Sequence, residues 1–155
     1  MSMHVWIDAD SCPRTVRDYI VRYTGKTGIP VFFVANRDIP VDVPSPFFSM
    51  IVCGGSPGAA DDYIADHAKK NDIVITRDIP LAARLIELDI KVLNDRGTIF
   101  SRENISKRLS ERNYNLQLVQ MGVVGDKSQT YGKKEFTFFA NCFDREFQRM
   151  LKVSL

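Results

Sequence analysis

Five short apolar runs occur in the first hundred residues, and most are followed by an amphipathic stretch. The apolar runs are 4–7, 31–34, 50–53, 72–76 and 91–93. Apolar residues then recur at helical spacing in 16–23, 59–70 and 81–88. Short uninterrupted apolar runs are typical of strands that are buried on both faces, as in parallel sheets. The alternation predicts a layered α/β domain with a central, mainly parallel sheet of about five strands.

The remaining residues change character after Thr98. Ser101 begins a pattern typical of a capped helix, and the 155 residues suit one domain spanning 1–155. Within it, 113–155 reads as a basic loop and a C-terminal helix packed on the domain, with a mobile Gly- and Lys-bearing loop at 122–134. Four phenylalanines in the last helix recur at spacings of three and four: Phe136, Phe139, Phe143 and Phe147. This stripe predicts packing either on the domain or on a second copy in a homodimer.

Charge is unevenly distributed along the chain. The formal net charge is +2, but residues 1–100 hold 11 Lys+Arg against 13 Asp+Glu, whereas residues 101–155 hold 10 against 6. An acidic front with a basic tail could set metal-binding carboxylates beside a surface that attracts phosphates. The competing interpretation is an uneven but solvated surface.

Cysteine content and hydropathy indicate the compartment. Three cysteines, Cys12, Cys53 and Cys142, form no C-x-x-C pair, which argues against a disulfide framework or a cysteine-based zinc site. No apolar run approaches the ~20 residues of a membrane span, and the N-terminus lacks a signal-peptide pattern. We therefore expect a cytoplasmic protein without a membrane partner.

Carboxylates gather where the predicted strands end. They are Asp8 and Asp10 after the first strand, Asp61 and Asp62 in the helix after the third, Asp78 after the fourth and Asp95 after the fifth. Functional groups of parallel α/β sheets collect beyond the carboxyl ends of the strands. Mg²⁺ and Mn²⁺ prefer oxygen ligands, and a bound cation would relieve the repulsion between clustered carboxylates. The sequence predicts a divalent-metal site with Mg²⁺ or Mn²⁺ as cofactor, in which Asp8, Asp10 and Asp78 are catalytic.

Simpler roles compete at several of these positions. Asp10 and Asp78 could cap helices, Asp61 or Asp62 could complement a helix dipole, and Asp95 could be a turn residue. The candidates for contact with a substrate phosphate are Ser11, Asn36, Thr76, Arg77 and Arg96. Each of these polar residues also suits a cap, a turn or a local ion pair.

Several blocks of the sequence match a known family in the same order. They are Asp8-Ala9-Asp10-Ser11-Cys12-Pro13, Val34-Ala35-Asn36, Ala60-Asp61-Asp62-Tyr63-Ile64-Ala65, the run 72–82 that contains Ile75-Thr76-Arg77-Asp78, Leu93-Asn94-Asp95-Arg96-Gly97 and Glu103-Asn104-Ile105. With these blocks, residues 4–112 resemble the YaiI/YqxD family of uncharacterised bacterial proteins. The stretch 113–155 is similar only around 139–141 and 144–145.

The resemblance implies a PIN-like three-layer α/β/α domain, the fold of metal-dependent nucleases that act mostly on RNA. It implies that Asp8 and Asp78 correspond to the acids after the first and fourth strands. Asp61 or Asp62 would supply the acid on the middle helix and Asp95 the last one. Asp10 belongs to the Asp-x-Asp pattern of this family in particular. Likeness of fold does not establish catalysis.

Three functions follow as hypotheses. The first is a Mg²⁺- or Mn²⁺-dependent nuclease that hydrolyses phosphodiesters in nucleic acid, with RNA favoured. The second is a haloacid-dehalogenase-type phosphatase with Asp8 as nucleophile, although Cys12 stands where that class has a hydroxyl. The third is a non-catalytic PIN-like module that binds nucleic acid or a protein.

Overall fold

The computed structural model describes residues 2–41, 45–122 and 130–154, so part of the loop expected at 122–134 lies outside the described residues. The strands are β1 (Val5–Asp8), β2 (Val31–Ala35), β3 (Phe48–Val52), β4 (Ile73–Ile75), β5 (Lys91–Leu93) and β6 (Ile99–Phe100). The helices are the 3-10 turn η1 (Ala9–Ser11), then α1 (Arg14–Gly25), α2 (Ala59–His67), α3 (Ile79–Glu87), α4 (Arg102–Gln120) and α5 (Lys133–Ser154).

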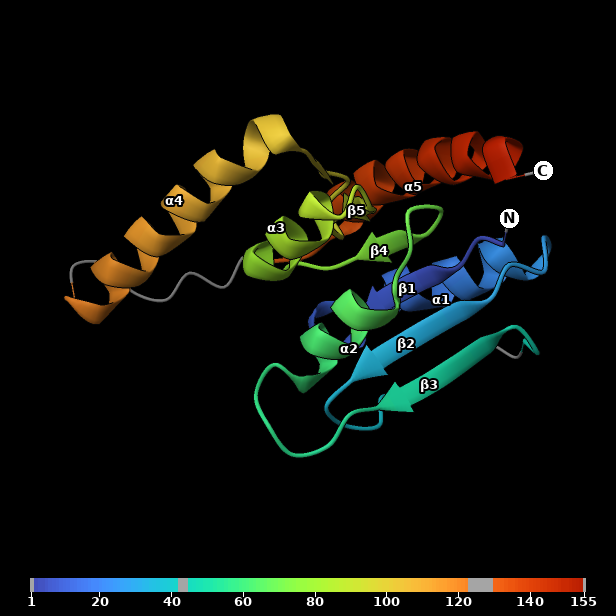
Figure 1. The fold of residues 1–155 in the computed structure, drawn as a ribbon, viewed down its shortest axis with the longest axis horizontal. Helices are drawn as coiled ribbons and strands as arrows, with labels where there is room; N and C mark the ends of the chain where they lie inside the picture. The colour runs from blue at the N-terminus through green and yellow to red at the C-terminus, as the bar shows by residue number, and fades with distance from the viewer. Residues whose placement is uncertain (1, 42–44, 123–129, 155) are drawn as a thin grey trace.

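The strands form one sheet in the order β3-β2-β1-β4-β5-β6 (Figure 1). The first five are parallel, and only the short β6 pairs antiparallel with β5. The predicted mainly parallel sheet is therefore confirmed, with a sixth strand added at its edge.

Helices cover both faces of the sheet. Along β1, Val5 and Ile7 face the layer of α1 and α5, whereas Trp6 faces the layer of α2, α3 and the start of α4. Successive side chains of a strand point to opposite faces of the sheet. A strand in which every residue is apolar therefore contributes side chains to the hydrophobic cores on both faces. This arrangement confirms the expected three-layer α/β/α architecture.

The last two helices differ in how they meet this body. In α5, Phe139, Phe143 and Phe147 are fully buried against the α1 layer. The phenylalanine stripe therefore packs on its own domain, which leaves these three rings unavailable to a second copy. The N-cap of α4 is Ser101, whose side chain forms a reciprocal capping box with Asn104, as the sequence pattern indicated. The rest of α4 points away from the sheet (Figure 1). None of the described helices is long and apolar enough to cross a lipid bilayer.

Candidate functional site

The site lies where the chain changes direction across the sheet. From β1 the chain adds β2 and β3 on one side, and β4 and β5 then pair on the other side of β1. In doubly wound sheets, ligands bind outside the carboxyl ends of the strands at such a switch point. Asp8 ends β1 and Thr76 follows β4, and the Thr76 hydroxyl donates to Asp8 Oδ2 across the switch point at 2.8 Å.

A pocket of about 340 Å³ opens at this place. Its lining residues are Asp8, Asp10, Ser11, Asn36, Gly58, Ala60, Asp61, Arg77 and Asp78. The fold thus brings together four of the carboxylates and three of the polar side chains that the sequence singled out. Four carboxylates around one arginine make the pocket strongly acidic.

Asp8 forms the floor of the pocket and is 5% exposed. Thr76 and Ser11 both donate hydroxyl hydrogen bonds to its Oδ2, at 2.8 and 3.1 Å. Burial raises the pKa of Asp8, and the two hydroxyl donors oppose that rise only in part. The charges of Asp78 and Asp10 raise the pKa of Asp8 further. Asp8 is therefore a buried carboxyl group whose negative charge is poorly compensated.

Asp78 occupies the first turn of α3 as its N-cap. Its Oδ1 accepts a hydrogen bond from the backbone N–H of Leu81 at 2.8 Å, and its own N–H donates to Thr76 Oγ1 at 3.0 Å. Capping and ligand binding were alternatives in the sequence. The structure shows the cap, which uses one carboxylate oxygen and directs the side chain into the pocket.

The two acids of α2 have different surroundings. Asp61 lines the pocket, whereas Asp62 is 67% exposed and pairs with Arg84 of α3 at 2.9 Å. Burial, together with the charges of Asp78 and Asp8, raises the pKa of Asp61 to about 7. Successive helical residues point about 100° apart, so only one of the pair can face the pocket. Asp61 is the member that shares the site with Asp8 and Asp78.

Asp10 connects the pocket to the start of α2. Its Oδ2 accepts the backbone N–H of Asn36 at 2.9 Å, and Asn36 Oδ1 in turn accepts the backbone N–H of Ala60 at 3.2 Å. Arg37 lies 3.6 Å from Asp10 Oδ1. Asp10 thereby orders the Asn36 loop, and Asn36 caps the helix that carries Asp61. This positioning role accounts for two predicted residues.

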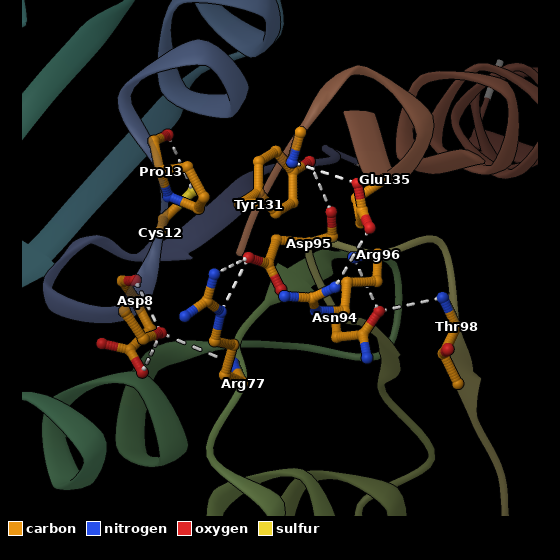
Figure 2. Close-up of polar contacts among 12 residues, drawn as sticks. Asp8, Cys12, Pro13, Arg77, Asn94, Asp95, Arg96, Thr98, Tyr131 and Glu135 are labelled. Carbon is orange, nitrogen blue, oxygen red and sulfur yellow. Dashed lines mark hydrogen bonds and ion pairs between the residues drawn. The ribbon is translucent and has the colours of Figure 1, made fainter. Parts of the chain in front are cut away.

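Asp95 and Arg96 are not among the residues that line the pocket. Figure 2 shows their polar contacts with Arg77, Tyr131 and Glu135. Asp95 is 1% exposed, and its Oδ2 accepts from Arg77 Nε at 2.7 Å and pairs with Nη2 at 2.5 Å. Arg96 lies over the Tyr131 ring and 3.7 Å from Glu135. Of the polar residues predicted to meet a phosphate, Arg77 faces the pocket, and Arg96 faces the start of α5.

The donor chemistry of the pocket fits a hard divalent cation, because carboxylate oxygens surround it and two of the acids have raised pKa values. In the described part of the chain, however, no three Asp, Glu, His or Cys side chains are arranged as a ready-made metal cage. Mg²⁺ is commonly held by only one or two carboxylates together with water and substrate phosphate. The pocket therefore fits a cation bound through few protein ligands.

Several residues with a part in the site escaped sequence reasoning. Tyr131 donates its hydroxyl to the backbone oxygen of Asp95 at 2.6 Å across 36 positions, a contact that no local pattern signals. Arg84 was also missed: it pairs with Asp62 at 2.9 Å, and its charge opposes the rise in the pKa of Asp61. Gly58 lines the pocket and has φ +84°, which a glycine at a helix N-cap can adopt without strain.

Comparison with known proteins gives consistent matches. The profile of the family described as "Uncharacterized BCR, YaiI/YqxD family" matches residues 6–149. A "UPF0178 protein" of Treponema denticola is 42% identical over 150 residues, covering 97% of this chain and 95% of the relative. The one from Psychromonas ingrahamii is 41% identical over 152 residues, covering 98% and 100%. That from Treponema pallidum is 39% identical over 152 residues, covering 98% and 85%. No solved structure matches this chain significantly.

Proposed function

This chain belongs to the YaiI/YqxD family, and on that premise we propose that it is a divalent-metal-dependent nuclease that hydrolyses phosphodiester bonds, with RNA as the favoured substrate. The observation that carries the proposal is the pocket at the switch point, where Asp8, Asp61 and Asp78 converge with raised pKa values for Asp8 and Asp61. Neither the family description nor the names of the relatives assigns an activity, so the PIN-like nuclease character belongs to the proposal.

The electrostatics of the pocket support a cation. Three converging carboxylates repel one another, and burial with the charges of Asp78 and Asp8 raises the pKa of Asp61 to about 7, so this carboxyl group is only partly ionised near neutral pH without metal. Asp61 lines this pocket and contributes no apolar surface to either core cluster. A bound cation would remove the repulsion, so the site is better suited to a charged ligand than to stabilising the fold.

The chain's own residues would divide the work as follows. Asp8 and Asp78, on either side of the switch point, would hold the cation, and Asp61 would complete the ligand set or accept a proton from the attacking water. Ser11 and Thr76 keep Asp8 in place through hydrogen bonds of 3.1 and 2.8 Å. When bound, Mg²⁺ or Mn²⁺ supplies Lewis acidity and neutralises charge on the phosphoryl oxygens.

The test pairs metal binding with cleavage. Mn²⁺ is titrated into the protein and into Asp8→Asn and Asp78→Asn by calorimetry, and the same proteins are incubated with labelled single-stranded RNA and DNA in Mn²⁺ or Mg²⁺. We expect wild-type binding and cleavage, and a loss of cleavage of roughly 10³-fold in each variant. Asp66→Asn is the matched control, because Asp66 is an exposed acid on α2 that does not line the pocket.

A verified metal-dependent cleavage that is unchanged in Asp8→Asn would falsify this mechanism. The alternative, a non-catalytic module that binds nucleic acid or a protein, draws support from the lack of a three-ligand cage among the described residues. Mn²⁺ binding without turnover on the RNA and DNA panel would favour that alternative.

A further inference from the structure

Arg77, which lines the pocket, forms an ion pair with the buried Asp95, which does not line it. Arg77 directs Nε and Nη2 toward Oδ2 of Asp95, at 2.7 and 2.5 Å, while its side chain stays 43% exposed. A planar guanidinium has donors along more than one edge, so the contact with Asp95 uses one edge and leaves Nη1 pointing elsewhere. Figure 2 shows Arg77 between Asp95 and Asp8, with its remaining nitrogen on the side of Asp8.

The pair is poorly explained as a device for stability. Asp95 is 1% exposed, and its Oδ1 is buried without a hydrogen bond from any described residue. Burying a charged pair costs desolvation energy, and an unsatisfied carboxylate oxygen adds to that cost. Because Asp95 does not line the pocket, it also has no access to a cation there. Its geometry suits a residue that fixes the orientation of Arg77.

The loop that carries Asp95 is itself fixed against α5. The Tyr131 hydroxyl donates to the backbone oxygen of Asp95 at 2.6 Å. Gly97, at φ +83°, lies so close to α5 that an added Cβ would fall 2.5 Å from the backbone oxygen of Phe138. Arg96 adds an ion pair with Glu135 at 3.7 Å. Tyr131, just before α5, and the first turns of α5 therefore fix the position of the loop whose Asp95 binds Arg77.

We propose that Arg77 binds a phosphoryl oxyanion of the substrate, and that Asp95 is a positioning residue for Arg77 rather than a metal ligand. This inference rests on the proposed function, since it assigns the recognition of a phosphodiester to the same pocket. Arginine forms directed, charge-assisted hydrogen bonds to phosphate. The affinity of arginine for phosphate depends on how well the N–H donors of the guanidinium group are oriented. Asp95 and its clamp on α5 supply that orientation.

The experiment measures metal and phosphate binding separately. Mn²⁺ affinity is measured by calorimetry, and inorganic phosphate is titrated in Mg²⁺ while the Arg77 Nε–H resonance, assigned with Arg77→Lys, is followed by NMR. We expect Asp95→Asn to keep Mn²⁺ affinity within about twofold and to weaken phosphate binding roughly tenfold. Tyr131→Phe, which leaves the carboxylate intact, should keep Mn²⁺ affinity and weaken phosphate binding by a smaller factor.

The controls are Asp89→Asn and Arg102→Lys, which alter an exposed Arg–Asp pair outside the pocket and should change neither affinity. A loss of Mn²⁺ affinity of tenfold or more in folded Asp95→Asn would make Asp95 a ligand and overturn the proposal. An Arg77 Nε–H chemical shift that does not change as phosphate is added would also overturn the proposal. If wild type binds no metal, the nuclease proposal fails, and the response of Arg77 to phosphate without metal then decides this inference alone.

Discussion

Two buried aspartates lie at opposite edges of the sheet, one at the amino ends of the strands and one at the carboxyl ends. They show how the effect of burial on a carboxylate depends on the groups around it. Asp72, just before β4, is 1% exposed and accepts hydrogen bonds from the His4 and Lys69 backbone N–H groups and from Trp6 Nε1, at 2.9, 2.9 and 3.0 Å. Asp8, at the other edge, is 5% exposed but receives two hydroxyl donors and faces further acids. Compensated charge at one edge serves the fold, and uncompensated charge at the other is available to a ligand.

The largest effect should come from making the same substitution at both edges. Asp72→Asn places amide N–H donors against the donors of Trp6 and Lys69, so we expect the free energy of unfolding to fall by about 3 kcal/mol. Asp8→Asn should change it by about 0.5 kcal/mol or less, because the Ser11 and Thr76 hydroxyls can rotate to accept. Urea unfolding at pH 7 in EDTA measures both. An equal loss in the free energy of unfolding for Asp72→Asn and Asp8→Asn would show that the two carboxylates contribute equally to stability, against this comparison.

A smaller effect should come from the cation. Mn²⁺ at a hundred times its dissociation constant should raise the free energy of unfolding by about 2.7 kcal/mol, because it binds only the folded protein. The gain should vanish in Asp8→Asn and persist in Asp66→Asn, as measured by urea unfolding with and without Mn²⁺. If Asp8→Asn gained as much as wild type, the cation would be binding elsewhere.

The smallest effect concerns pH. Burial and neighbouring acids raise the pKa of Asp61 from 3.8 to about 7, so the folded protein holds more protons than the unfolded chain between these values. Without metal, stability should therefore fall as pH rises from about 4 to 7. Asp61→Asn should reduce that slope, leaving the part that comes from the raised pKa of Asp8, and should stabilise the protein by about 1 kcal/mol at pH 8, a figure kept small because the pocket is open to water.

The adjacent acid on α2 provides the control for this pH effect. Asp62→Asn alters a carboxylate that is 67% exposed, so its pH profile should follow wild type. Unfolding measured in EDTA from pH 4 to pH 8 compares the three proteins. A wild-type stability that rises steadily over this range would contradict the assigned repulsion at Asp61.

The sequence predicted the positions of the acids in and around the pocket unequally well. The placement of Asp8 and Asp78 near each other was predictable because strand ends in a parallel sheet share one edge, and each acid lies at or within three residues of the end of an apolar strand. The choice between Asp61 and Asp62 needed the rotation of α2, which a sequence gives only to within a residue or two. The contacts of Asp95 could not be predicted from any local pattern. Its partner Arg77 and the Tyr131 clamp lie 18 and 36 positions away, and only the packed chain brings them together.

The burial of α5 against the sheet also has a consequence for biosynthesis. Since α5 follows all six strands in the chain, the ribosome makes the sheet before it makes the helix that covers one face. Until α5 emerges, one face of the sheet is not covered by the rings of Phe139, Phe143 and Phe147. The loop at Gly97 also lacks its close contact with the backbone of Phe138. The nascent chain therefore carries an apolar sheet face that stays partly uncovered until α5 has been made, and exposed apolar surface of this kind favours aggregation.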